Sequence, residues 1–201
     1  MKTPLRYQIT EYDCGSVSLV NCITYLFERN EIPAELIKVI STFTLDCYDE
    51  KGRLGAGGTI REMIYFISRW IDEFSEQKSI PLDAKYLKGK SVELLAILKC
   101  LKAGGCVNLR TYNDGAEHYI TLTGYDNEYI YLFDPYYRNP EEFKGNDMID
   151  CIVSNAFSYN RRVRIEQFVS DKKLNFALGP VDKREAVLFN RNDISMQIEL
   201  A

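Results

Sequence analysis

The sequence predicts an α+β fold, and the prediction rests on its length and on two patterns that differ between its halves. A chain of 201 residues that is 46% hydrophobic can bury one sizeable core. Apolar residues recur at helical spacing in the first half, whereas alternating, aromatic-rich runs typical of strands fill the second half. Helices followed by strands indicate a fold in which helices and an antiparallel sheet are segregated.

Three or four helices are expected before the sheet, each from an apolar stripe and a start or stop signal. Asp13 is a good N-cap for the first helix, whose apolar stripe is wide enough to indicate a buried helix. Pro33 begins a shorter helix at a position that tolerates proline. Thr59 and Ser91 are the expected N-caps of two further helices, the second of which ends at Gly104-Gly105.

The expected strands are CVNLRTY, HYITLTG, YIYLFDP and RVRIEQF, and a hairpin of FALG with EAVLF follows near the end. A loop centred on Asp126 would join the second and third of these runs. This register pairs Leu122 with Ile130 on an apolar face and places His118 opposite Asp134. Directly opposed residues have Cβ atoms about 4.5 to 5.5 Å apart, so the carboxylate would reach the imidazole.

Composition and charge argue against several kinds of protein. The net charge of −4 with interspersed signs offers no basic stripe, so no nucleic-acid partner is expected. No apolar run is long enough for a signal peptide or a membrane span, which predicts a cytoplasmic protein with reduced cysteines. With one histidine and no C-x-x-C pair, no metal or other cofactor is expected. Without repeats or linkers, residues 1–201 are expected to form a single domain of undetermined oligomeric state.

Cys14 lies where the polar segment before it becomes an apolar helix. Free N–H groups and the helix dipole favour a thiolate in a first helical turn. His118 held by Asp134 would supply a base and a group that orients it, which completes a nucleophilic thiol site. Gln8, on the incoming segment, is the candidate side-chain donor of an oxyanion hole, with the Cys14 N–H as the second donor.

The combination of Gln8, Asp13-Cys14-Gly15, His118 at the start of a strand, and Asp134-Pro135 resembles the bacteriocin-processing, double-glycine leader peptidases and their stand-alone relatives. These are papain-like cysteine peptidases. The resemblance covers roughly residues 5–140 and implies a papain-like fold with a Cys-His-Asp triad that hydrolyses a peptide or protein through a thioester. Residues 141–201 lie outside it and are expected to add strands whose role the sequence does not assign.

Two classes of function remain open. The first is a cysteine peptidase, or an acyltransferase in which another acceptor replaces water; the second is a peptide-binding module without turnover. The other five cysteines are interpreted as inert core residues. The glycine-rich run at 55–59 lacks the Gly-Lys-Ser/Thr ending of a phosphate-binding loop, so it is interpreted as a helix-entry loop.

Overall fold

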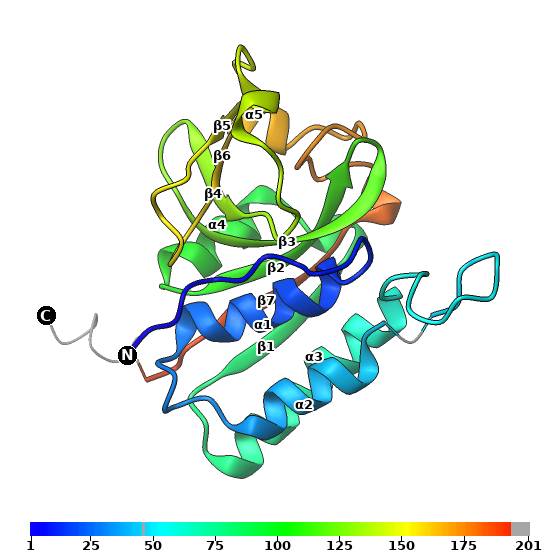
Figure 1. Cartoon of the computed structure of the whole chain (residues 1–201). Coiled ribbons are helices and arrows are strands. Elements are labelled where there is room, and N and C mark those ends of the chain that lie inside the picture. Colours follow the sequence, from blue (N-terminus) through cyan, green and yellow to red (C-terminus); the bar gives the residue numbers. More distant parts are fainter. Residues whose placement is uncertain (46, 194–201) are drawn as a thin grey trace, which may run out of the picture.

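The computed structural model describes residues 1–45 and 47–193, which form one antiparallel sheet with helices on both faces (Figure 1). In this part of the chain, seven strands follow the order β1-β7-β2-β3-β4-β6-β5. The helices are α1 (Cys14–Leu26), α2 (Ala34–Phe43), α3 (Arg61–Lys78), α4 (Leu94–Lys102) and α5 (Ile165–Phe168). The strands are β1 (Asp83–Lys88), β2 (Cys106–Asn113), β3 (Ala116–Tyr125), β4 (Tyr129–Phe133), β5 (Ile149–Cys151), β6 (Arg161–Arg164) and β7 (Glu185–Asn190). The predicted α+β class is confirmed.

Two apolar cores lie on the two faces of the sheet. Helices α1, α2 and α3 cover one face, where α3 runs along β1 and α2 packs beside α3 (Figure 1). Helices α4 and α5 cover the other face. Strand β7 shows the alternation that divides the cores: Val187 and Phe189 belong to the core beneath α1, α2 and α3, while Ala186 and Leu188 belong to the core beneath α4. The sheet is therefore buried on both faces.

All four predicted helices are present, but two of their predicted N-caps are wrong. The N-cap of α3 is Ile60 rather than Thr59, whose side chain instead packs against α1 beside Gly15. The N-cap of α4 is Glu93, because Ser91 belongs to a short 3-10 turn, η1 (Gly89–Ser91), that precedes the helix.

The strand predictions hold for β2, β3 and β4 and fail in part further on. The predicted strand RVRIEQF stops at Arg164, which pairs with Tyr129, the first residue of β4, and the chain then turns into α5 at Ile165. The FALG segment forms no hairpin with EAVLF, because Phe176 has a left-handed backbone and its N–H donates to the carbonyl of Tyr112. EAVLF becomes β7 and inserts between β1 and β2. Strands β1 and β5 were not predicted.

The register predicted for the β3–β4 hairpin is also wrong. Leu122 pairs with Leu132 rather than Ile130, and a bulge between Leu122 and Gly124 absorbs one extra residue. This register, continued along the strand, places His118 two residues from the position opposite Asp134. This shift of two residues keeps His118 and Asp134 on the same face of the sheet, whereas beyond the bulge, at Tyr125 and Ile130, the shift is three residues.

No helix within residues 1–45 and 47–193 has the length and apolar character needed to cross a bilayer.

Candidate active site

Cys14 is the first residue of α1, and Asp13 occupies the N-cap position, as predicted. However, the Asp13 side chain does not accept the hydrogen bond from the first turn of α1 that an N-cap usually accepts. The Asp13 carboxylate accepts hydrogen bonds from the N–H groups of Ile9 and Thr10 and from the Thr10 hydroxyl, so it fixes the preceding loop. The backbone N–H groups of Tyr119 and Gly15 each help to lower the pKa of the Cys14 thiol.

Buried hydrogen bonds fix α1 against β3. The Ser18 hydroxyl donates to the carbonyl of Tyr119 over 2.8 Å, and the Thr121 hydroxyl donates to the carbonyl of Ser18 over 3.0 Å. Gly15 permits this close approach, because a Cβ there would lie 3.0 Å from Thr59 and 3.4 Å from the Tyr119 ring. Tyr119 follows His118 directly. These contacts therefore hold the start of α1 beside the histidine.

His118 and Asp134 form a buried pair in which Nε2 and Oδ1 are 2.7 Å apart. Their contact was predicted, although the register that suggested it was wrong. The side chains meet across the two-residue offset, which is within reach for diagonal neighbours on one face of a sheet. Since Nε2 is engaged by the carboxylate, Nδ1 is the ring nitrogen that remains for Cys14.

Asp134 is held from several sides. Asn160 accepts a hydrogen bond from the Asp134 N–H over 2.7 Å and donates to its carbonyl over 2.8 Å. The N–H of Tyr136 donates to Oδ1 over 2.9 Å. The buried Arg161 places Nη2 3.8 Å from Oδ2. These contacts restrict the movement of the Asp134 carboxylate, so it stays hydrogen-bonded to the His118 imidazole.

The electrostatics of the pair formed by Cys14 and His118 favour separated charges. Burial alone would raise the pKa of the Cys14 thiol, but the hydrogen bond and positive charge of His118 outweigh it and lower that pKa. Burial likewise opposes the charge on His118, yet hydrogen bonds with Asp134 and Cys14 and their negative charges raise the pKa of His118 to about 10. A thiolate beside an imidazolium is the protonation state that these contacts stabilise.

The remaining cysteines have different surroundings. Burial raises the pKa of Cys100 to about 12, and burial together with the neighbouring Cys22 raises the pKa of Cys106. Cys22, Cys100 and Cys106 pack within the apolar cores, as predicted, whereas Cys47 and Cys151 are only half-buried, which differs from the prediction. Among these thiols, thiolate character is favoured at Cys14.

Gln8 lies on the segment that leads into α1 and is tied to the loop after Asp134. Its backbone N–H donates to the carbonyl of Pro135 over 2.8 Å. Its side-chain amide donates to the carbonyl of Thr10 over 2.6 Å. That bond uses one of the two amide hydrogens, so the second remains available.

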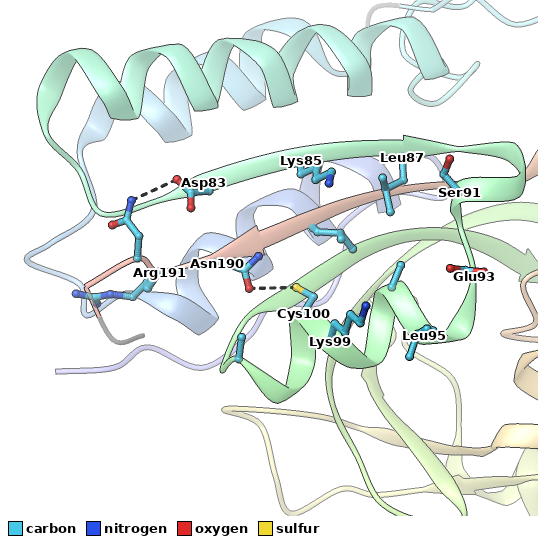
Figure 2. A pocket seen from close by; sticks show the side chains of 14 residues that line it. Asp83, Lys85, Leu87, Ser91, Glu93, Leu95, Lys99, Cys100, Asn190 and Arg191 are labelled. Atoms are coloured by element: carbon cyan, nitrogen blue, oxygen red, sulfur yellow. Dashed lines mark hydrogen bonds between the residues drawn. The ribbon is translucent and has the colours of Figure 1, made fainter. Parts of the chain in front are cut away.

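A cavity of about 810 Å³ lies between α4 and strands β1 and β7 (Figure 2). Figure 2 shows Cys100 bonded to Asn190 on its wall. The described residues that line it do not include Cys14 or His118. A second cavity, of about 400 Å³, is lined by Cys14, so a group bound there would lie beside the thiol. Within the described residues, no group of three or more His, Cys, Asp or Glu side chains could hold a metal.

Sequence reasoning missed Asn160 and Arg161, which hold Asp134. Both are distant from it along the chain, so no local motif links them. The one sequence feature that could have identified Arg161 is the alternation of β6, in which Arg161 lies on the same inward face as Val163. An arginine at an inward position of a strand requires a buried partner.

The model of the Peptidase_C39 like family matches residues 1–161. No curated protein is significantly similar. A C39-like peptidase from Bacillus anthracis is 17% identical with a TM-score of 0.54, and the alignment covers 92% of this chain and 93% of that one. The leader-peptide complex of a double-glycine motif protease from an AMS/PCAT transporter is 15% identical (TM-score 0.45, 94% and 92% covered). The peptidase domain of Streptococcus ComA is 14% identical (TM-score 0.46, 93% and 98% covered).

Proposed function

Because the chain belongs to the Peptidase_C39 like family, we propose that it is a cysteine peptidase in which Cys14, His118 and Asp134 form the catalytic triad. The observation that carries this proposal is the convergence of three groups from separate elements. A thiol with a lowered pKa at a helix start meets a histidine whose pKa is raised to about 10, and a buried carboxylate binds that histidine over 2.7 Å. Nucleophile, base and orienting group are the parts that thiol hydrolysis needs.

In the proposed reaction, the Cys14 thiolate attacks the carbonyl carbon of a peptide bond, and the electron pair of the C=O bond moves to oxygen. The imidazolium of His118 donates its proton to the departing amine as the C–N bond breaks, which leaves a thioester on Cys14. His118 then accepts a proton from water as the water attacks the thioester. The acid product leaves, and the thiolate and imidazolium are restored.

The oxyanion of each tetrahedral intermediate needs donors. We assign this role to Gln8 and to the N–H group of Cys14. The bond from the Gln8 N–H to Pro135 supports the assignment, because it anchors Gln8 to the segment that carries Asp134. The Gln8 amide nitrogen has a second hydrogen besides the one donated to Thr10, and we expect that hydrogen to donate to the oxyanion.

A peptide library tests the proposal. We expect the wild-type protein to cleave a subset of peptides, detected as paired fragments by mass spectrometry, and the Cys14→Ala variant to cleave none. Cys22→Ala, in the same helix but within the core, is the matched control and should retain cleavage. Products that carry an added amine in place of water would identify an acyltransferase. Peptides that bind the folded wild type and stay intact would identify a binding module, which contradicts the proposal.

A further inference from the structure

The cavity of about 400 Å³ beside Cys14 has walls from several elements and carries three cationic side chains. Arg61 comes from α3, Arg110 from β2, and Lys183 from η3, a 3-10 turn (Val181–Lys183). We call this space the cationic cavity. Its wall also includes Tyr119, whose ring lies against Gly15 and therefore close to the start of α1. A group bound in the cavity would thus lie next to the nucleophile.

Two guanidinium groups converge in this cavity. Arg61 and Arg110 both donate to the backbone carbonyl of Lys183. Arg110 is the deeper of the two: its side chain is 6% exposed, compared with 35% for Arg61. Burial and the positive charge of Arg61 lower the pKa of Arg110, which shows that the two cations repel each other. An anion placed between them would relieve that repulsion.

The protein's own carboxylates compensate these cations only in part. Glu185 is buried, with its Oε2 3.4 Å from Nε of Arg61, and its Oε1 accepts a hydrogen bond from the Tyr119 hydroxyl. Burial raises the pKa of Glu185 to about 7, although that hydrogen bond and the two arginines oppose the rise. Its burial therefore weakens Glu185 as a permanent counter-charge for the two arginines.

The acidic residues that line the cavity itself lie at its exposed rim. Glu62 is exposed, and Glu117 binds Arg110 with a side chain that is 56% exposed. Solvent screens these rim charges more than it screens the buried Arg110. The interior therefore remains favourable for an anion.

We propose that the cationic cavity is a substrate subsite that binds a carboxylate next to the scissile bond. The carboxylate belongs to an acidic side chain of the substrate or to the free C-terminus of a peptide cleaved near its end. This inference rests on the proposed function, because the subsite is defined by its place beside Cys14. Paired N–H donors of a guanidinium match the two oxygens of a carboxylate, so Arg61 and Arg110 give both charge and geometry.

Affinity alkylation tests the subsite without peptide hydrolysis. Chloroacetyl-glutamate α-amide is compared with chloroacetyl-glutamine α-amide, and chloroacetyl-glycine with chloroacetyl-glycinamide. The Cys14 sulfur displaces chloride in each case, and mapping by mass spectrometry gives the rate. We expect at least one acid to react about 10- to 100-fold faster than its amide, the range for a charge-assisted hydrogen bond. The first pair reports a side-chain carboxylate, and the second reports a terminal one.

Substitutions in the cationic cavity test whether its arginines, and not the reactivity of Cys14 itself, cause the preference for an acid over its amide. Arg61→Gln should reduce the acid-to-amide ratio towards one, whereas Arg69→Gln, an exposed position in the same helix, should keep it. Arg110→Lys retains a charge at the buried site and should reduce the ratio partially. Iodoacetamide is the neutral reference. Ratios near one for both wild-type pairs, with Cys14 labelled by iodoacetamide, would overturn the subsite alone. Failure of iodoacetamide to select Cys14 would overturn the proposed function and the subsite with it.

Discussion

Arg161 is buried beside Asp134, with 3.8 Å between Nη2 and Oδ2. The same guanidinium donates to the carbonyl of Asn160 and lies over the Phe143 ring. A charged pair enclosed in this way is costly to break from one side, because the remaining charge loses its partner. The pair therefore links the stability of the fold to the orientation of His118.

A double-mutant cycle measures this link. We expect Arg161→Met to lower the free energy of unfolding, but by less than the roughly 3 to 5 kcal/mol typical of a fully uncompensated buried charge, because Asp134 keeps the His118 imidazolium as its other partner. The double variant Arg161→Met/Asp134→Asn should recover part of that loss. Urea unfolding at pH 7 gives the four values. If the two single changes add to within about 0.5 kcal/mol, the residues are not coupled.

The Asp134→Asn change should alter the pH dependence of catalysis. Asp134 is a main cause of the raised pKa of His118, so its replacement should lower that pKa from about 10. Proton donation by His118 would then be lost at lower pH, and the alkaline limb of kcat/KM should move to lower pH. We also expect kcat/KM to fall by about 100- to 10,000-fold at its optimum. An unchanged alkaline limb would show that Asp134 does not act on the imidazole.

Gln8→Ala tests the oxyanion donor. Such a donor acts in the transition state, so kcat should fall by about 100- to 1,000-fold while KM stays nearly unchanged. Alkylation of Cys14 by iodoacetamide, which forms no oxyanion, should be preserved. A raised KM with unchanged kcat would assign Gln8 to substrate binding instead. Slower alkylation would mean that the change has disturbed the start of α1.

Cys14 should be the most reactive of the mapped thiols at mildly acidic pH. Its pKa is lowered by His118, whereas burial raises the pKa of Cys100 to about 12. Alkylation needs the thiolate, so its rate should rise with pH through a pKa below about 8.5, the usual value of a free thiol. His118→Ala should move this rise to higher pH. Limiting iodoacetamide with mass-spectrometric mapping makes the measurement, and preferential labelling of Cys22 or Cys106 would contradict it.

The sequence was sufficient to predict two parts of the site: the helix start at Cys14 and the contact of His118 with Asp134. The change from a polar segment to an apolar run at Cys14 identified the helix start, because burial periodicity and the N-cap position are local properties. The contact of His118 with Asp134 was predicted despite a wrong register. The error was two residues, and side chains keep their face under an even shift.

Long-range pairing set the features that sequence reasoning missed. β7 inserts between β1 and β2, although it is far from both in sequence. This placement brings Glu185, the first residue of β7, into contact with Tyr119 and Arg61. The support of Asp134 by Asn160 likewise depends on β6 pairing with β4. The single-domain organisation over 1–201 and the cytoplasmic location stay predictions.

Trapping the covalent intermediate tests the central claim most directly. A cleaved peptide from the library is mixed with the wild-type protein, quenched with acid within a turnover, and examined by intact mass spectrometry with proteolytic mapping. We expect an increase in mass equal to the acyl fragment, located on Cys14 and released by hydroxylamine as for a thioester. Cleavage that proceeds in Cys14→Ala, or an acyl group found on another residue, would contradict it.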